Sequence, residues 1–561
     1  MKELNTKIQH ESMYKINRYN RWVEKAIEDE DLIKELKEMN AAQIDDAFRD
    51  ELSFGTGGLR GIIGAGSNRM NIYTVARASQ GLSNYLQNND NPSVVIGYDS
   101  RMKSDTFAKA AAGVFASNGV RVYFWSELLP VSMVSFAVRY LHASAGVMIT
   151  ASHNPSQYNG YKVYGADGCQ ITTEAATKIL SEIEKVDCFD VTINMAPFVE
   201  YIHDTVITSF LTEVKKQSVL FGDEINKDVN IVYSPLNGTG LKPVTRILRE
   251  CGYANITVVE EQKQPDGSFP TCPYPNPEIR ETMDLGIEYC RKTKADLFLA
   301  TDPDCDRCGI AVKDGEDYRL LSGNEVGLLL LDYICSQRIK HKQMPEAPVF
   351  IKTIVTMDLA ERIAEHYGVR TINVLTGFKY IGEQIGMLEE KGHESSYICG
   401  FEESYGYLTG SYVRDKDAVN AAFMISEMFA FYKTRGICLL DRLEQIWQEY
   451  GYCLTRLYSY EFGGSGGMAR MQEIMAEFRR GVESIGGMAV EKVLDYSQGI
   501  DSLPKSDVLK YFLKENCSVV VRPSGTEPKL KLYISIMAKG SDEGRLKEEL
   551  IVHDIENVIC I

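Results

Sequence analysis

AGVMITASHNP, residues 145–155, sets the local fold around the most informative serine of the chain. The apolar half of this stretch predicts a buried strand. Pro155 pushes Asn154 out of helical geometry, so the chain has to turn as soon as the strand ends. Ser152 therefore lies on a short loop at the carboxyl end of a strand, where open α/β sheets bind their ligands. A serine followed by a histidine, with Lys162 ten residues on, is a candidate covalent nucleophile.

The composition limits the classes of protein to which the chain can belong. At 561 residues it is too long for a single hydrophobic core, and three to five domains are expected. Its contents of 44% hydrophobic and 25% charged residues are those of a soluble globular protein. The formal net charge of −17 argues against a nucleic-acid or acidic-membrane partner. An anionic substrate would need a locally basic site.

The sequence also predicts the cellular compartment. Thirteen scattered cysteines, an odd number, fit reduced thiols in a cytosolic protein. The first residues, MKELN, contain no apolar signal core, and no apolar run approaches membrane-spanning length. We expect a soluble cytoplasmic protein.

Strands and helices alternate after about fifty charged, amphipathic residues. Ser93–Tyr98 and 120–124 are expected strands, and Ser104–Ser117 is an expected helix that ends at Gly119. Such alternation predicts a mostly parallel sheet covered by helices. The pattern recurs in three further blocks, which begin near residues 227, 325 and 451. In each block one apolar strand ends in a dense polar loop, and these loops follow residues 149, 300, 399 and 521.

The polar loop of the second block has three aspartates at alternating positions, Asp302, Asp304 and Asp306. Carboxylates this close repel one another, so the spacing indicates a cation, and all-oxygen ligands suit Mg²⁺, Mn²⁺ or Ca²⁺. An EF-hand is excluded, because Arg307 and Lys313 stand where Gly and a bidentate Glu are needed. A solvated acidic turn is the alternative.

The cysteines of the same loop, Cys305 and Cys308, form a C-x-x-C pair without a second pair nearby. We interpret them as small buried residues rather than as a zinc or redox site.

The remaining polar loops have groups that suit a phosphorylated sugar. RPSGTEPK, residues 522–529, combines cations, hydroxyls and a flexible glycine, which suits a phosphate, although a plain polar turn is equally consistent. GFEESYG, residues 400–406, offers acceptors for sugar hydroxyls, and RDKD follows at 414–417. Asp417 is an expected helix N-cap. FGTGGLRG, residues 54–61, Arg101 and Lys379 are weak signals by themselves.

Together these motifs resemble the α-D-phosphohexomutase family, the phosphoglucomutases and phosphomannomutases. Five motifs occur in the family's order along the whole chain: FGTGGLRG, TASHNP with YNGYK, DPDCDR, GFEESYG with RDKD, and RPSGTEPK. The residues of these motifs are most similar to those of the bacterial phosphoglucomutase and phosphopentomutase-like branch. The loop at 400–406 has an extra Phe401 before Glu402, relative to the commoner Gly-Glu pattern.

The resemblance implies a fold of the α/β class. It consists of three consecutive α/β domains of shared topology with mixed sheets and a smaller C-terminal α+β domain, all arranged around a central cleft. We expect domain I with an N-terminal helical extension at 1–215, domain II at 216–324, domain III at 325–450 and domain IV at 451–561.

The resemblance also implies the roles of the site residues. Ser152 becomes the phosphorylated serine, and its phosphate completes a site for one Mg²⁺ ion at Asp302, Asp304 and Asp306. The residues expected around the reacting phosphate are Arg60, His153, Lys162, Arg307, Lys379 and Lys416. The expected contacts to the rest of the substrate are Thr376, Gly377, Glu402, Ser404, Arg414, Arg522, Ser524, Gly525, Thr526 and Lys529.

The implied reaction exchanges a phosphoryl group between two positions of a sugar. Phosphoserine 152 gives its phosphoryl group to a sugar monophosphate, the bisphosphate turns around, and its other phosphate returns to the serine. A sugar 1,6-bisphosphate is the expected priming activator. His153 or Lys162 would move the hydroxyl proton; we favour Lys162, with a pKa lowered by neighbouring cations.

Other activities remain open from the sequence. The expected substrates are glucose 1-phosphate and glucose 6-phosphate, with mannose phosphates as further candidates. A phosphopentomutase or a sugar-1,6-bisphosphate synthase would use the same fold. A metal-dependent phosphohydrolase and a non-catalytic binding protein are more distant alternatives. We expect a monomer or a small homo-oligomer.

Overall fold

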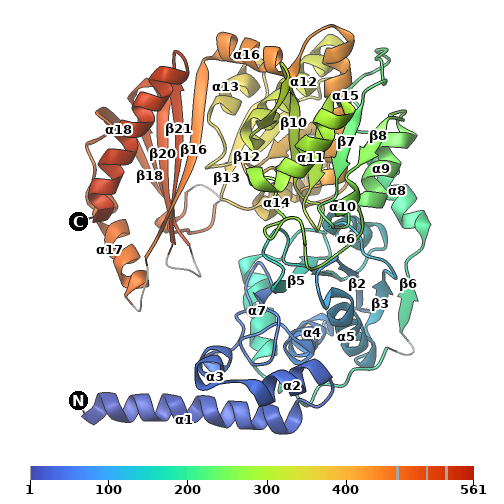
Figure 1. Cartoon of the computed structure of the whole chain (residues 1–561), viewed down its shortest axis with the longest axis vertical. Coiled ribbons are helices and arrows are strands. Elements are labelled where there is room, and N and C mark those ends of the chain that lie inside the picture. Colours follow the sequence, from blue (N-terminus) through green and yellow to red (C-terminus); the bar gives the residue numbers. More distant parts are fainter. Residues whose placement is uncertain (1, 196–197, 463–465, 501–502, 525–528, 561) are drawn as a thin grey trace.

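A computed structural model describes residues 2–195, 198–462, 466–500, 503–524 and 529–560 of the chain. Four sheets follow one another along it, and each lies inside one of the four expected domain ranges. The boundaries between the domains stay predictions. Figure 1 shows the first unit in blue and cyan at one end, and the fourth, in orange and red, beside the third.

The first unit begins with a helical extension whose helices are α1 (Lys2–Lys25), α2 (Glu30–Glu38) and α3 (Ala41–Phe48). The strands that follow are β1 (Leu59–Ile62), β2 (Ser93–Tyr98), β3 (Arg121–Phe124), β4 (Ala145–Ile149), β5 (Tyr158–Gly165) and β6 (Val199–Tyr201). They lie in the order β1-β5-β4-β2-β3-β6. The covering helices are α4 (Ile72–Leu86), α5 (Ser104–Ser117), α6 (Val131–Tyr140) and α7 (Thr173–Ile183).

The second unit has the strand order β11-β10-β9-β7-β8. Its strands are β7 (Ile231–Ser234), β8 (Ile256–Val258), β9 (Leu297–Thr301), β10 (Cys308–Asp314) and β11 (Asp317–Leu321). The helices that accompany them are α8 (Asp204–Lys215), α9 (Leu241–Glu250), α10 (Glu260–Lys263) and α11 (Arg280–Thr293).

The third unit has the strand order β13-β12-β14-β15. Its strands are β12 (Val349–Thr353), β13 (Arg370–Val374), β14 (Tyr397–Phe401) and β15 (Tyr407–Leu408). Its helices are α12 (Gly323–Lys340), α13 (Leu359–His366), α14 (Phe378–Glu390), α15 (Ala418–Thr434) and α16 (Leu439–Tyr450). Asp417 caps α15 as expected, because its side chain accepts from the Val419 amide, but it is fully buried.

One topology recurs in these three units. Each has three parallel strands and, beside the first-listed of them, an antiparallel strand: β4-β2-β3 with β5, β9-β7-β8 with β10, and β14-β12-β13 with β15. The loops that contain Ser152, the aspartates and Glu402 each join the first-listed strand to its antiparallel neighbour. The three predicted site loops therefore occupy the same topological position, which confirms the expected shared topology and mixed sheets.

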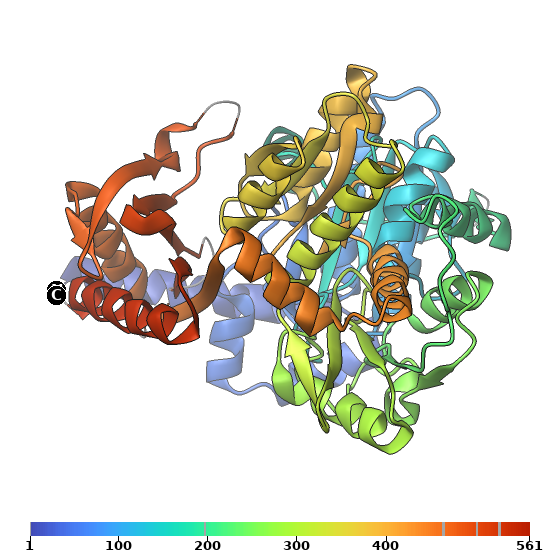
Figure 2. The same ribbon diagram turned by 90° about the horizontal axis from the view of Figure 1, so that it is seen from above.

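The fourth unit is smaller, and its sheet is antiparallel throughout, in the order β16-β21-β20-β19-β18-β17. Its strands are β16 (Tyr452–Glu461), β17 (Ser484–Ile485), β18 (Met488–Asp495), β19 (Leu509–Leu513), β20 (Cys517–Pro523) and β21 (Lys529–Ala538). Helices α17 (Gly467–Arg480) and α18 (Ser541–Cys560) lie on the side of the sheet away from the other units (Figures 1 and 2).

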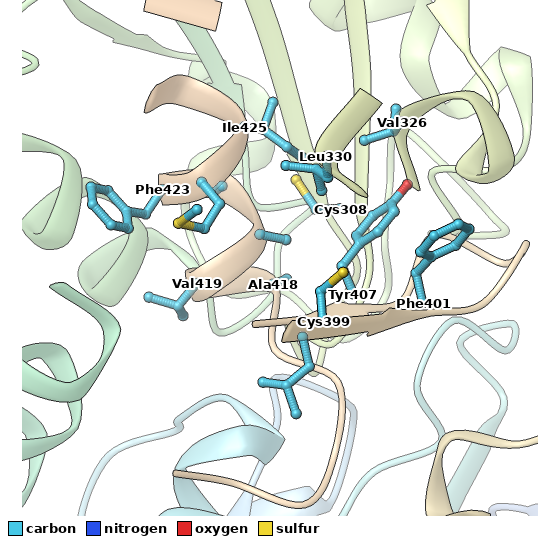
Figure 3. Close-up of a cluster of buried hydrophobic side chains, with 14 of the residues drawn as sticks. Cys308, Val326, Leu330, Cys399, Phe401, Tyr407, Ala418, Val419, Phe423 and Ile425 are labelled. Carbon is cyan, nitrogen blue, oxygen red and sulfur yellow. The ribbon is translucent and has the colours of Figure 1, made fainter. Parts of the chain in front are cut away.

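A hydrophobic cluster contains buried residues of the first three units, and Figure 3 shows the part of it around Cys308, Phe401 and Tyr407. Cys308 directly follows the aspartate loop, and Phe401 directly precedes Glu402. Both side chains are buried in this cluster with Tyr407 and residues of α12 and α15. The extra Phe401 thus fills the core, and Gly327 of α12 leaves room for its ring. The interpretation of Cys305 and Cys308 as buried residues agrees with their full burial.

In the part of the chain that the structure describes, every helix is too short or too polar to cross a membrane.

Candidate active site

Ser152 lies in the loop after β4 with its backbone in the left-handed region, at φ +52°. This conformation is costly for a residue other than glycine and points to local constraint. The Ser152 amide donates to Thr150 Oγ1 at 2.8 Å. Its own hydroxyl donates to Asp302 Oδ2 at 3.0 Å and lies 3.1 Å from His153 Nδ1. The side chain is only 4% exposed, so the serine faces the aspartate cluster rather than open solvent.

Asp302, Asp304 and Asp306 are buried and lie close together, with one ligand oxygen from each within 4.8 Å of the others. Asp302 Oδ1 accepts from the amides of Asp306 and Arg307, which curls the loop. Burial and the charges of Asp306 and Asp304 raise the pKa of Asp302 well above its usual value. Within the described part of the chain, no donor reaches Asp304 Oδ1 or Asp306 Oδ1. Unpartnered buried carboxylate oxygens fit a Mg²⁺ ion.

Two lysines partly balance these carboxylates. Lys162 Nζ lies 2.9 Å from Asp304 Oδ2, and Lys416 Nζ lies 2.9 Å from Asp306 Oδ2. Burial alone would lower the pKa of Lys162, but the charges of Asp304 and Asp306 outweigh it and raise that pKa. The expectation of a lowered pKa at Lys162 is therefore wrong for this geometry, because carboxylates rather than cations are its nearest charges.

The other cations expected near the reacting phosphate surround the serine loop. Arg60 lies at the exposed edge, where its guanidinium donates to Asn154 Oδ1 at 3.3 Å. Arg307 is ion-paired with Glu278. Burial and the charges of Arg307 and Arg60 lower the pKa of His153 well below its usual value. His153 is consequently neutral at physiological pH.

The third unit supplies the groups expected to contact the sugar. Glu402 is buried, and its Oε1 accepts from the Gly377 amide at 3.0 Å. Burial is the main cause that raises the pKa of Glu402 to about 7. Ser404 is half-buried in the same loop, and the Thr376 hydroxyl has no hydrogen-bond partner among the described residues.

Lys379 connects the third unit to the glycine-dense loop of the first. Its Nζ donates to Thr56 Oγ1 at 2.7 Å. The loop lies flat against β5, because a side chain at Gly58 would stand 1.7 Å from the Tyr161 carbonyl oxygen, and its φ is +75°. Lys379 thus contacts the same loop that contains Arg60, whose guanidinium reaches Asn154 of the Ser152 loop.

Arg414 lies apart from the group. It is fully buried, its guanidinium donates to Glu389 at 2.6 Å, and it also contacts the carbonyls of Ser411 and Val413. These partners give it a structural environment rather than the substrate contact expected from the sequence.

The fourth unit contributes the loop between β20 and β21. Arg522 is half-buried near the end of β20, and the Ser524 amide donates to the Lys529 carbonyl at 2.7 Å. Lys529 forms an ion pair with Glu461. The expected phosphate contacts Gly525 and Thr526 lie outside the described residues.

Sequence reasoning missed several residues that contact the site loops. Glu278 pairs with Arg307, and Lys531 of β21 interacts electrostatically with Glu278 and Glu403. Arg101, which the sequence indicated only weakly and without a role, donates to four carbonyls of the serine loop. The available signal for Arg101 was its spacing two residues after Asp99, at the end of the neighbouring strand β2.

Models of the phosphoglucomutase/phosphomannomutase family match the chain in four segments. Its α/β/α domains I, II and III match residues 51–188, 208–315 and 322–450, and its C-terminal domain matches residues 470–550. The chain belongs to this family. A phosphoglucomutase of Staphylococcus saprophyticus is 36% identical over 96% of the chain and 99% of its own length.

Solved structures agree on the fold. A phosphoglucomutase/phosphomannomutase family protein of Burkholderia thailandensis superposes with a TM-score of 0.68 at 16% identity, over 90% of this chain and 97% of its own. The parafusin phosphoglucomutase of Paramecium, in an open form, gives a TM-score of 0.69 at 16% identity, over 91% and 96% of the two chains.

Proposed function

We propose that the protein is a phosphoglucomutase that interconverts glucose 1-phosphate and glucose 6-phosphate through a phosphoserine at position 152 and a glucose bisphosphate. The observation that carries this proposal is the 3.0 Å contact between Ser152 Oγ and the buried three-aspartate cluster. The staphylococcal relative, which this chain matches over nearly its full length, is a phosphoglucomutase, and this supports glucose phosphates as the substrates.

In the first half-reaction the bond between phosphorus and Ser152 Oγ breaks, and a bond to the free sugar hydroxyl forms. The sugar loses its hydroxyl proton to a base, and the serine recovers a proton. After the bisphosphate turns around, the other phosphoryl group returns to Ser152, so the phosphate count of the enzyme is unchanged. A glucose 1,6-bisphosphate primes enzyme that has lost its phosphoryl group.

Asp302, Asp304 and Asp306 would hold one Mg²⁺ ion. Such an ion supplies positive charge that offsets the negative charge of the transferring group. Arg60, Arg307 and Lys379 add further positive charge around Ser152 and hold the transferring oxygens.

Two groups are placed to take the hydroxyl proton. His153 is neutral and adjoins Ser152 Oγ. Lys162 becomes competent once a cation at the aspartates weakens the attraction that raises its pKa. The choice of Lys162 as the base that takes the hydroxyl proton therefore depends on a metal bound at the aspartates.

We assign the sugar hydroxyl contacts to Glu402 and Ser404, with Thr376, Gly377 and Lys416 beside them. The second, nonreacting phosphate is assigned to the loop between β20 and β21, with Arg522, Ser524, Gly525, Thr526 and Lys529. Arg414 is left out of the binding set, because both terminal nitrogens of its buried guanidinium already donate to protein groups. We place the enzyme in the cytoplasm.

The test is an isomerisation assay on the 1-phosphates of glucose, mannose and ribose, with and without the matching bisphosphate. We expect fastest turnover of the glucose ester, stimulated by glucose 1,6-bisphosphate. Release of free phosphate in place of isomerisation would indicate a phosphohydrolase, and preference for the ribose ester would indicate a phosphopentomutase. Net formation of bisphosphate from a high-energy donor would indicate a bisphosphate synthase. Any of these three results would contradict the proposal.

A further inference from the structure

Arg101 lies directly behind the serine loop and outside the group of residues around the reacting phosphate. One terminal nitrogen donates to the carbonyls of Pro155 at 2.9 Å and Tyr158 at 3.1 Å. The other donates to the carbonyls of Ser152, at 2.5 Å, and Asn154. One side chain thus binds four carbonyl groups between residues 152 and 158.

The guanidinium is held in place by Asp99. Both side chains are buried, and Arg101 Nε lies 3.5 Å from Asp99 Oδ2. Asp99 Oδ1 also accepts from the Arg101 amide at 2.9 Å and from the Ser104 hydroxyl at 2.8 Å. A buried charge without a partner would be costly, and the carboxylate offsets part of that cost.

These contacts coincide with the strained backbone of Ser152. The residue has φ +52°, which it does not adopt readily by itself. Its hydroxyl reaches the aspartates in this conformation. A hydrogen bond to the Ser152 carbonyl acts on the peptide plane next to the strained torsion, so it helps to determine where the hydroxyl points.

Arg101 also contacts the second unit. Its guanidinium carbon lies 5.1 Å from the centre of the Phe269 ring, a cation–π contact. The backbone of Gly267 pairs with Arg101, and a side chain at Gly267 would stand 2.3 Å from the Met102 amide nitrogen. The segment around Gly267 and Phe269 therefore packs directly on the residue that holds the serine loop.

We propose that Arg101 is a positioning residue for phosphoryl transfer: it holds the Ser152 loop in its strained conformation and couples that conformation to the docking of the second unit through Phe269. The inference rests on the proposed function of Ser152. It concerns the direction of Ser152 Oγ and not the binding of the sugar, whose predicted contacts lie on the third and fourth units.

Arginine is required in this role because of its geometry. A planar guanidinium presents five donors in a fixed fork, whereas a lysine has three donors on a single nitrogen. A lysine in its place would keep the charge beside Asp99 but could not reach four carbonyls that approach two different nitrogens. Arg101→Lys thus removes positioning while it preserves charge.

The experiment compares full-length wild type, Arg101→Lys and Phe269→Leu, with Arg121→Lys, on an exposed position of β3, as the matched control. We expect Arg101→Lys to lower kcat about a hundredfold, as a misplacement near 1 Å does, while KM for glucose 1-phosphate changes less than about twofold. Phe269→Leu should lower kcat about threefold to tenfold with KM unchanged. The double variant should lower kcat by a smaller factor than the product of the two single-variant factors.

A purely structural role would give a different result. Arg101→Lys would then lower the melting temperature while kcat per folded enzyme stayed at the wild-type value, and this would overturn the proposal. If Arg101→Lys does not fold, Phe269→Leu decides: a lowered kcat with unchanged KM supports positioning, and an unchanged kcat overturns it.

Failure of the proposed function is seen separately. Wild-type enzyme incubated with glucose 1,6-bisphosphate would then show no added phosphoryl group on Ser152 by peptide mass spectrometry. If wild type is phosphorylated and Arg101→Lys transfers its phosphoryl group to glucose 1-phosphate at the wild-type single-turnover rate, only the positioning role is contradicted.

Discussion

The aspartate loop of the second unit is joined by main-chain hydrogen bonds to the first and third units, whereas the fourth unit is attached to the third through the side chains of its strands. The Val131 amide donates to the Asp304 carbonyl, the Cys308 amide to the Tyr405 carbonyl, and the Ala418 amide to the Cys305 carbonyl. These bonds join the first unit to the second and the second to the third, within the site itself.

The fourth unit meets the others through side chains away from its loop. Asp358 accepts from Lys510 Nζ at 2.7 Å and from the Ser518 hydroxyl, and an apolar cluster around Ile354, Leu375 and Tyr533 lies next to it. The contrast indicates a division of roles between the units. The reacting centre is built from units that hydrogen-bond to one another through the main chain, while the fourth unit, to which we assign the far phosphate, is attached through the side chains of its strands.

Asp304→Asn changes the reacting centre itself and should have the largest effect on activity. We expect kcat to fall about a hundredfold to a thousandfold, since one charge-stabilising group is lost, and the Mg²⁺ concentration needed for half-maximal rate to rise. Asp314→Asn, at an exposed position of β10, is the control. Activity that survives both Asp304→Asn and chelation of divalent metal would exclude a role for the metal.

Arg522→Ala addresses the fourth unit's loop. Loss of a charged hydrogen bond to phosphate should cost about 2–3 kcal/mol of binding, which raises KM for glucose 1-phosphate thirtyfold or more. The melting temperature should stay within the error of wild type. Arg480→Ala, an exposed arginine of α17, is the matched control. A variant that unfolds while its folded fraction keeps the wild-type KM would indicate a structural arginine.

Asp358→Asn addresses the attachment of the fourth unit. Burial alone would raise the pKa of Asp358, but the charges of Lys510 and Lys352 hold it well below its usual value. The ionised form therefore stabilises the fold above the unfolded pKa near 4, and the stabilisation disappears as the pH falls toward the lower folded value.

We expect Asp358→Asn to lower the free energy of unfolding by about 1.5–2 kcal/mol at pH 7, less than for a fully buried pair, with the difference shrinking below pH 4. Urea unfolding followed across this pH range measures it, with the exposed Glu491→Gln as control. A difference that is constant from pH 7 to pH 3 would show that the charge is not the cause.

Substitution of Glu402, which belongs to the third unit's part of the reacting centre, should have the smallest effect. Its pKa of about 7 means that the carboxylate form, the better acceptor for the sugar hydroxyls that we assign to it, is populated mainly above pH 7. We expect kcat/KM of wild type to rise threefold to fivefold between pH 6 and pH 8, and this rise to be reduced in Glu402→Gln. The exposed Glu390→Gln should keep the wild-type profile. Identical profiles for wild type and Glu402→Gln would contradict the assignment.

The sequence predicted those parts of the molecule that depend on local pattern. The strand before Ser152 and the helix Ser104–Ser117 have the expected bounds, because apolar runs and capping residues act over short distances. Asp417 was expected as an N-cap for the same reason, but its burial was not, since burial depends on Ser132 and Tyr412 packing against it.

Long-range contacts explain what the sequence did not predict. The pKa of Lys162 depends on aspartates more than 140 positions away, and the burial of Arg414 depends on Glu389. The sequence signal at Arg101 was weak because each of its carbonyl partners belongs to a loop about fifty residues further along the chain. A short sequence pattern does not predict contacts between residues so far apart in the chain.

The phosphoserine mechanism is tested by the mass of Ser152 peptides during a single turnover. Wild-type enzyme treated with glucose 1,6-bisphosphate should carry one phosphoryl group on Ser152, and excess glucose 1-phosphate should remove and then restore it as glucose 6-phosphate appears. Ser152→Ala should show neither the modification nor isomerisation, whereas Ser181→Ala, on the exposed surface of α7, should behave as wild type. Isomerisation by Ser152→Ala, or a phosphoryl group on another residue of the active wild type, would contradict this mechanism.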